Sequence, residues 1–478
     1  MDYSRIRLKE TEWPEIGIPA GLPVPEPTVA ELGERLIRCR RLMAASGLTH
    51  LVVYGDKEHF ANLMYLTHFD PRFEEALLII NEGDSPLILV GNECEGHLNA
   101  SPLHRQGKLR HERFQSFSLM GQPRDKSRPL KVIFQGEGMS KDSKVGCVGW
   151  KYFTGIEFDH PEQVIEIPSF IVDILRSICG YANVLNSNDL LMSPRYGLRS
   201  RCSVQEIVFF EYSNMMGSEG MKNLLKNFRA DVPDFELLQE YRYTGYPLSC
   251  HIGMKSSGNQ HISLSSAMGT LIKRGEPCST SIAYWGSNIC RAGWVAENEE
   301  DLPQQAKAYV QDFAAPYFQA CAIWYEKLRL GTTGQVLQEI IDVCLPFSDF
   351  GVYLNPGHLI HYDEWMHSPV YRNSTDEICS GMYMQVDIIP RSPRYGSCRM
   401  EEGVIIADRM LQKSLKEQYP EVYARCMRRR DFMITELGFD LPEEVLPLSN
   451  MPAIVPPFFL NHFFAILVAF SNLFVVRS

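Results

Sequence analysis

The first part of the chain alternates between helix-like and strand-like patterns of apolar residues. Residues 28–47 carry apolar side chains near one face, with Thr28 placed to cap the start and Gly47 the end, and this pattern predicts a helix. Short apolar runs, each typical of a buried strand, follow at 50–55, 75–80, 86–91 and 144–149. Such alternation predicts an α/β domain that extends to about residue 190.

The second part of the chain begins with a strong helix signal. Ser203 followed by Glu206 forms a capping box, and the helical pattern continues to about residue 228. Beyond a strand-rich stretch that ends near residue 295, helices are predicted at 303–328 and 333–344 and strands at 381–390 and 397–408, with a shorter helix earlier at 233–243. We therefore expect a second domain of mixed helices and strands.

Composition excludes some classes of function. A chain of 478 residues with 45% hydrophobic and 22% charged residues is typical of a globular protein with two or three domains. The net charge of -11 argues against a nucleic-acid partner, because phosphate binding needs a basic surface. The 13 cysteines lack metal-site or disulfide spacing, and no signal peptide opens the chain, so we expect reduced thiols and a cytoplasmic location.

The C-terminal segment 454–478 is apolar enough to suggest a membrane span. Its prolines and asparagines interrupt the apolar run, which weakens that interpretation. We therefore favour a segment that docks on the body of the protein, or on a second subunit, over a membrane anchor.

The stretch "NPGHLIHYDEWMHSPV" at residues 355–370 is unusually polar. It contains three histidines and two acids, His358, His361, His367, Asp363 and Glu364. Their spacing does not match the helical HExxH motif of zinc proteases, and the preceding Pro-Gly predicts a turn. Taken alone, the stretch is better explained as a polar loop than as a metal site.

The motifs that follow this loop change that interpretation. "GHLIHYDEWMHSP", "SGMYMQVDIIP" and "CRMEEGVIIAD" occur in the order seen in the creatinase and proline-specific aminopeptidase family, which this chain resembles. The resemblance implies an α/β (α+β) protein with the pita-bread fold and a homodimeric assembly. It implies a creatinase-like α/β domain at 28–195 and a pita-bread catalytic-type domain at 196–445. A Pro-rich leader at 1–27 precedes these domains and an apolar tail at 446–478 follows them.

The resemblance also implies candidate site residues. His358 matches the family's histidine ligand, and Asp387 and Glu401 take the places of two acidic ligands. The two aspartates that the family places on a hairpin are here Ser281 and Asn288, which are neutral. The family's upstream histidine has only His251 and His261 as nearby candidates.

These departures bear on the cofactor. Two neighbouring divalent ions need anionic bridging ligands, so the neutral hairpin argues against a dinuclear centre. The sequence leaves open the binding of at most one divalent ion, held by His358, Asp387 and Glu401. The other alternative is an active site without metal, as in creatinase. There Asp387, Glu401 and Glu402 would hold a cationic substrate, with His358 or His251 as the proton carrier.

Other residues receive supporting roles. Trp365 is a candidate pocket wall, and Arg72 with Phe73 resembles the stretch that creatinase-like dimers lend to the neighbouring subunit. Cys250 and His251 are adjacent, and adjacent strand residues face opposite sides, which argues against a thiol–imidazole pair.

We therefore expect a hydrolase acting on a C–N bond of a small amine, amidine or peptide-like substrate, without a dinuclear metal centre. Two alternatives stay open. One is an inactive pseudo-peptidase that binds a peptide or small ligand, and the other is a single-metal aminopeptidase.

Overall fold

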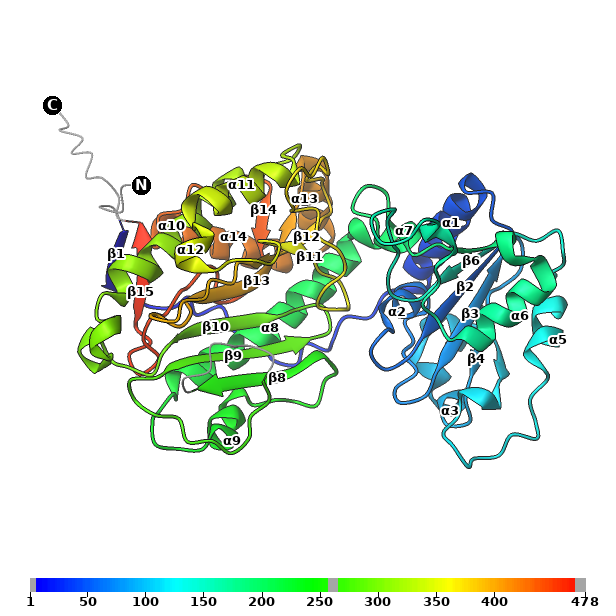
Figure 1. The fold of residues 1–478 in the computed structure, drawn as a ribbon, viewed down its shortest axis with the longest axis horizontal. Helices are drawn as coiled ribbons and strands as arrows, with labels where there is room; N and C mark the ends of the chain where they lie inside the picture. The colour runs from blue at the N-terminus through cyan, green and yellow to red at the C-terminus, as the bar shows by residue number, and fades with distance from the viewer. Residues whose placement is uncertain (1–5, 257–264, 469–478) are drawn as a thin grey trace. The chain divides into compact units, whose positions relative to one another are not determined.

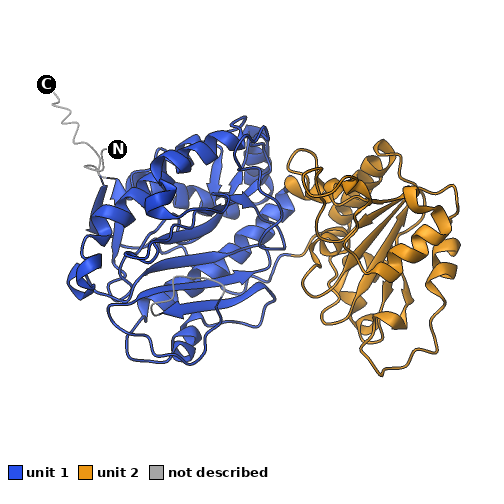
Figure 2. Cartoon of the chain, viewed as in Figure 1, with its two compact units in different colours: residues 1–25, 201–478 blue, residues 26–200 orange. Residues whose placement is uncertain are grey.

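The chain folds into two units, which are described separately below (Figures 1 and 2). The computed structural model describes residues 6–256 and 265–468. One unit is formed by residues 26–200, and the other by residues 1–25 together with 201–478. Residues 1–25 of the expected leader 1–27 are thus grouped with the second half of the chain, and Glu26 and Pro27 with the N-terminal unit.

The N-terminal unit is built on a mixed sheet of six strands in the order β5-β4-β3-β2-β6-β7. Its strands are β2 (His50–Gly55), β3 (Ala76–Asn81), β4 (Leu87–Val90), β5 (Arg110–Arg113), β6 (Val145–Val148) and β7 (Val184–Asn186). β2 pairs antiparallel with β3 and parallel with β6. The four strands predicted from apolar runs are confirmed as the central strands of this sheet.

Helices cover both faces of this sheet (Figure 1). The main ones are α1 (Val29–Ala45), α2 (Ala61–Thr67), α5 (Leu130–Gly136) and α6 (Ser169–Cys179), with one-turn helices α3 (Cys94–His97), α4 (Pro102–Arg105) and α7 (Asp189–Met192). The predicted cap of α1 is confirmed, since the Thr28 hydroxyl accepts a hydrogen bond from the Glu31 amide. Apolar residues of α5 and α6 form one buried cluster with alternate residues of β2, β3, β4 and β6.

The C-terminal unit contains a curled antiparallel sheet in the order β11-β12-β13-β10-β9-β8, with β14 paired to β13. Its strands are β8 (Leu248–Ser256), β9 (Pro277–Tyr284), β10 (Ile289–Trp294), β11 (His358–Leu359), β12 (Tyr383–Asp387), β13 (Arg399–Ile406) and β14 (Val445–Pro447). Together with the mixed sheet of the first unit, this sheet makes the protein a mixed α/β fold, as predicted.

The long helix α8 lies against this sheet. The helices of the unit are α8 (Val204–Lys226), α9 (Asp234–Leu238), α10 (Ala315–Lys327), α11 (Gly334–Cys344), α12 (Phe347–Phe350), α13 (Arg409–Gln418) and α14 (Pro420–Thr435). The capping box of Ser203 and Glu206 is confirmed at the start of α8. A Cβ atom at Gly217 would come within 2.9 Å of the Ile289 side chain, so the glycine permits a close approach of α8 to β10.

The prediction of a single helix at 303–328 is wrong. The regular helix α10 begins only at Ala315, and a π-helical turn at Val310–Ala314 precedes it. Pro316 explains the break, because it lacks an N–H and its ring clashes with the carbonyl four residues earlier. A wider turn relieves that clash.

The apolar C-terminal segment docks on the C-terminal unit as far as it is described. β15 (Phe464–Val468) pairs antiparallel with β1 (Ile6–Glu10), and the Phe459 amide donates to the Trp294 carbonyl over 2.8 Å. None of the helices in the described ranges is long and apolar enough to cross a membrane. Residues 469–478 lie outside the described residues.

Candidate functional site

Four residues form a row across the curled sheet at one level. Asp387 on β12 pairs with Glu401 on β13, Glu401 with Cys290 on β10, and Cys290 with Ser281 on β9. Cross-strand partners share a face of a sheet, so these side chains project to the same side. All four line a pocket of about 280 Å³. The strand register, rather than proximity in sequence, thus assembles the polar floor of this pocket.

The pocket gathers several of the residues that we predicted from the sequence. Its lining residues come from the sheet, the polar loop and nearby segments: Cys250, His251, Ser281, Asn288, Cys290, Tyr353, Leu354, Glu364, Trp365, Asp387, Ile389, Arg391, Arg399 and Glu401. Three predicted residues, His358, Glu402 and Arg72, are not among them.

His358 lies directly behind the pocket wall. It opens β11 and is completely buried. Its Nδ1 lies 3.2 Å from the Leu359 carbonyl oxygen, which fixes that nitrogen as the hydrogen-bond donor. Its Nε2 faces two carboxylates, 3.5 Å from Oε1 of Glu364 and 3.9 Å from Oδ2 of Asp387. The imidazole therefore contacts the pocket through acidic side chains rather than directly.

Trp365 separates His358 from the pocket space. Its indole stacks on the imidazole, with 4.0 Å between ring centroids and 21° between ring planes. Trp365 also lines the pocket. Its neighbour Glu364 also lines the pocket, and its carboxylate faces His358.

Arg399, to which the sequence analysis assigned no role, lies between the two buried acids. Its Nη2 donates to Oδ1 of Asp387 over 2.8 Å and also to Oε2 of Glu401. The side chain is 7% exposed. One signal for this contact is present in the sequence, because Arg399 and Glu401 are two residues apart on one strand and therefore share a face.

The second oxygen of Glu401 is also occupied by donors. Its Oε1 accepts from Nδ2 of Asn288 over 2.8 Å and from Nε2 of Gln385 over 3.5 Å. The Asn288 amide nitrogen lies 3.3 Å from Oε1 of Glu364 as well. Burial raises the pKa of Glu401, and the Arg399 guanidinium opposes that shift. Asn288 therefore holds two acids in place instead of supplying a negative charge.

The family resemblance of the sequence implies a metal held by His358, Asp387 and Glu401. Among the described residues, His358, Asp387 and Glu401 form a group whose ligand atoms lie within 4.8 Å of one another. The Arg399 guanidinium already contacts both carboxylates of this group. A divalent ion about 4 Å from that charge would meet a repulsion of roughly 8 kcal/mol at an effective dielectric constant of about 20. With neutral Ser281 and Asn288 beside them, these residues do not fit a resident divalent metal.

Glu402 does not reach the pocket, contrary to our expectation that it would help to hold a cation. It is buried on the opposite face of β13 and pairs with Nη2 of Arg291 over 2.8 Å. The reason is the alternation of side chains along a strand. Arg291 also donates to the main-chain oxygens of Glu401 and Met451, which ties β10 to β13 and to the segment after β14.

The other histidines of the polar loop are structural neighbours of the site. His361 is buried and its Nε2 lies 2.9 Å from Oε1 of Glu206, which ties the loop to the first turn of α8. His367 has its Nδ1 3.1 Å from the Ser368 carbonyl, and burial lowers its pKa. Neither residue lines the pocket.

Both Cys250 and His251 line the pocket, although adjacent strand residues were expected to face opposite sides. The pairing of β8 with β9 shifts register on both sides of Cys250, and such a bulge re-aims neighbouring side chains. Cys290 is buried beside them, and burial raises the pKa of its thiol to about 12. Cys290 is therefore a protonated, packed thiol rather than a nucleophile.

Two further candidates, Arg72 and His261, are not among the described residues of the C-terminal unit. Arg72 belongs to the N-terminal unit, where it adopts a positive φ of 55° and lies 3.4 Å from Asp70, next to the 56% exposed Phe73. Its role across a subunit boundary stays a prediction. His261 lies outside the described residues.

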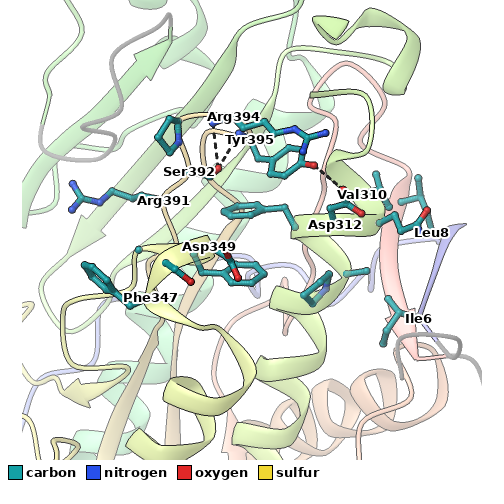
Figure 3. A pocket seen from close by; sticks show the side chains of 18 of the residues that line it. Ile6, Leu8, Val310, Asp312, Phe347, Asp349, Arg391, Ser392, Arg394 and Tyr395 are labelled. Carbon is teal, nitrogen blue, oxygen red and sulfur yellow. Dashed lines mark hydrogen bonds between the residues drawn. The ribbon is translucent and has the colours of Figure 1, made fainter. Parts of the chain in front are cut away.

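A second, larger hollow of about 1050 Å³ lies beside β1, the π-helical turn and α12 (Figure 3). Its polar groups bond mainly to one another. The Tyr395 hydroxyl donates to Asp312 over 2.8 Å, and the Ser392 hydroxyl accepts from the Arg394 amide over 3.2 Å. No histidine or cysteine is among the described residues that line it, so the smaller pocket is the better candidate for chemistry.

Comparisons with known proteins agree with this architecture. No family model matches the sequence, and no curated protein matches it significantly. Among solved structures, a prolidase from Pyrococcus horikoshii OT3 is similar, with a TM-score of 0.59 and 13% identity over 78% of this chain and 95% of that chain. An X-Pro aminopeptidase from Thermotoga maritima MSB8 gives a TM-score of 0.59 and 14% identity, with the same coverage. The protein therefore has the fold of the prolidases and X-Pro aminopeptidases, at low sequence identity.

Proposed function

We propose that the protein hydrolyses a C–N bond of a small amine-, amidine- or peptide-like molecule bound in the pocket, without a dinuclear metal centre. The supporting observation is the carboxylate–imidazole pair of Glu364 and His358, separated by 3.5 Å. Glu364 lines the pocket and can touch a ligand, whereas buried His358 acts through it. Such a pair can accept a proton and return it, as general acid–base catalysis requires.

The proposed step needs only water and these groups. Glu364 takes a proton from water while the water oxygen attacks the carbon of the C–N bond. His358 stabilises the protonated acid by sharing that proton through Nε2. The C–N bond then breaks, and the proton passes to the leaving nitrogen. The water oxygen stays on the carbon and the proton leaves on the nitrogen, so an amide or peptide gives a carboxylic acid and an amine, an amidine gives an amide and an amine, and an amine gives an alcohol and the released amine.

The test is an assay of amides, amidines and dipeptides in the presence of a chelator. Glu364→Gln should lower kcat/KM by about 10²–10⁴-fold, because it removes the proton acceptor. Asp349→Asn, in the larger hollow, is a matched control that should keep full activity. Turnover that requires added metal, or a fully active Glu364→Gln, would count against the proposal.

A pseudo-peptidase that binds a ligand without turnover is the second candidate. It is favoured by the position of Trp365, which covers His358, and by the pairing of Arg399 with both buried acids. Mass spectrometry of a bound ligand distinguishes the two. Recovery of the intact ligand after prolonged incubation supports binding alone, and recovery of an amine product supports hydrolysis.

We also propose that the protein is a homodimer, since the fold family that it resembles completes its pocket with a neighbouring N-terminal domain. Arg72 and the exposed Phe73 are the residues expected to be lent to the partner. Light scattering should give twice the 54.6 kDa mass of one chain. A monomer at micromolar concentration would contradict this, and Arg72→Ala would then leave activity unchanged.

A further inference from the structure

We propose that Arg399 is the resident cation of this pocket, and that its guanidinium keeps divalent metals out of a site that the other residues would otherwise form. The exclusion of metal by Arg399 holds whether the protein hydrolyses its ligand or only binds it. It can be tested by metal binding without an activity assay.

The contacts of Arg399 are those of a bridging cation. A single nitrogen, Nη2, contacts one oxygen of Asp387 and one of Glu401. The register of β12 and β13 places these acids directly opposite each other, and Arg399 lies two residues before Glu401 on the same face. The guanidinium is therefore positioned by the sheet itself rather than by a loop.

The remaining oxygen of Glu401 is not available to a metal either. It accepts hydrogen bonds from the side-chain amides of Asn288 and Gln385. An amide nitrogen donates hydrogen bonds and is no metal ligand, so the orientation of Asn288 suits a carboxylate and not an ion. Both oxygens of Glu401 are thus satisfied by N–H groups.

Without the guanidinium, the same pocket has the composition of a metal site. The imidazole of His358 and the carboxylates of Asp387 and Glu401 would stay within 4.8 Å of one another, and Nε2 of His358 has no hydrogen-bond partner among the described residues. One imidazole with two carboxylates suits divalent ions such as Mn²⁺, Co²⁺ and Zn²⁺. Two buried acids that lose their compensating charge would favour such an ion further.

The experiment is a calorimetric titration of untagged full-length protein with MnCl₂ and with CoCl₂. Wild type and Arg399→Lys, which keeps the positive charge, should show no saturable binding at micromolar metal. Arg399→Ala should bind one ion per chain at least about 100-fold more tightly than wild type. Adding Asp387→Asn to Arg399→Ala should abolish that binding, which assigns the ion to this pocket.

Two results would overturn the proposal. One is tight stoichiometric binding by wild type that Asp387→Asn removes. The other is a folded Arg399→Ala that binds no more metal than wild type.

If Arg399→Ala does not fold, the triple variant Arg399→Ala, Asp387→Asn, Glu401→Gln provides the decisive comparison. The triple variant should recover folding, because it removes the acids that the guanidinium neutralises. A triple variant that also fails to fold would contradict the role of Arg399 as the compensating charge.

Discussion

The indole of Trp365 stacks on the imidazole of His358, with ring centroids 4.0 Å apart. Trp365 is 36% exposed, and His358 has no exposed surface. The tryptophan therefore separates the pocket from the imidazole, and Glu364 is the polar side chain that lines the pocket and also faces His358.

Trp365→Ala should expose His358 to solvent. We expect diethyl pyrocarbonate to modify His358 at least about tenfold faster in this variant, with a loss of about 1 kcal/mol in the free energy of unfolding from the missing ring contact. Peptide mass spectrometry follows the modification. Trp150→Ala, which removes a similar histidine contact in the N-terminal unit, is the matched control and should leave His358 protected.

His358→Gln should abolish turnover, or ligand binding if the protein is a pseudo-peptidase. Glutamine is polar but cannot relay a proton, so a loss of about 10²–10⁴-fold in kcat/KM is expected for the enzyme. The melting temperature should shift by less than about 4 °C. His367→Gln should have a mild effect, because His367 does not line the pocket. Full function of His358→Gln would show that the site has been placed wrongly.

Glu402→Gln should destabilise the C-terminal unit. It leaves the fully buried Arg291 without its ionic partner, and breaking a buried pair costs about 3–5 kcal/mol. Urea unfolding followed by tryptophan fluorescence measures this loss. The double variant Arg291→Met, Glu402→Leu should be more stable than Glu402→Gln, since it removes both charges. Equal stability of Glu402→Gln and wild type would contradict the pairing.

His68 should make the stability of the N-terminal unit depend on pH. Burial lowers the pKa of His68 to about 4, from an ordinary value of 6.5. Between these values the unfolded chain binds a proton that the folded chain does not, so the free energy of unfolding falls as the pH decreases from about 6.5 toward 4. The contribution is about 2 kcal/mol by pH 5.

His68→Asn should remove this part of the pH dependence. Asparagine tolerates the left-handed backbone of this position, where φ is 53°. Urea unfolding of both proteins between pH 7.5 and pH 5.0 gives the difference in slope. His160→Asn, at a side chain that is 76% exposed, should leave the slope unchanged. Parallel curves for wild type and His68→Asn would disprove the assignment.

Local sequence patterns predicted most of the secondary structure and several of the site candidates. Apolar periodicity identified the central strands of the first sheet, and the capping box identified the start of α8, because both signals depend on residues close together in the chain. The order of the three motifs indicated His358, Asp387 and Glu401, which the structure brings within 4.8 Å of one another. The helical pattern of 303–328 does not reveal the break before α10, because apolar periodicity carries no information about the clash of the Pro316 ring with the preceding turn.

The contacts of the candidate residues depend on the tertiary structure. Asn288 and Glu401 are 113 positions apart, and the antiparallel register of β10 and β13 makes them neighbours. The same pairing sends Glu402 to Arg291 on the far face, and the pairing of β12 with β13 places Arg399 between two acids. Periodicity reports which residues share a face of one strand, but the partner across the sheet depends on strand order and register. The charge balance of the pocket, and with it the expected response to metals, follows from that register.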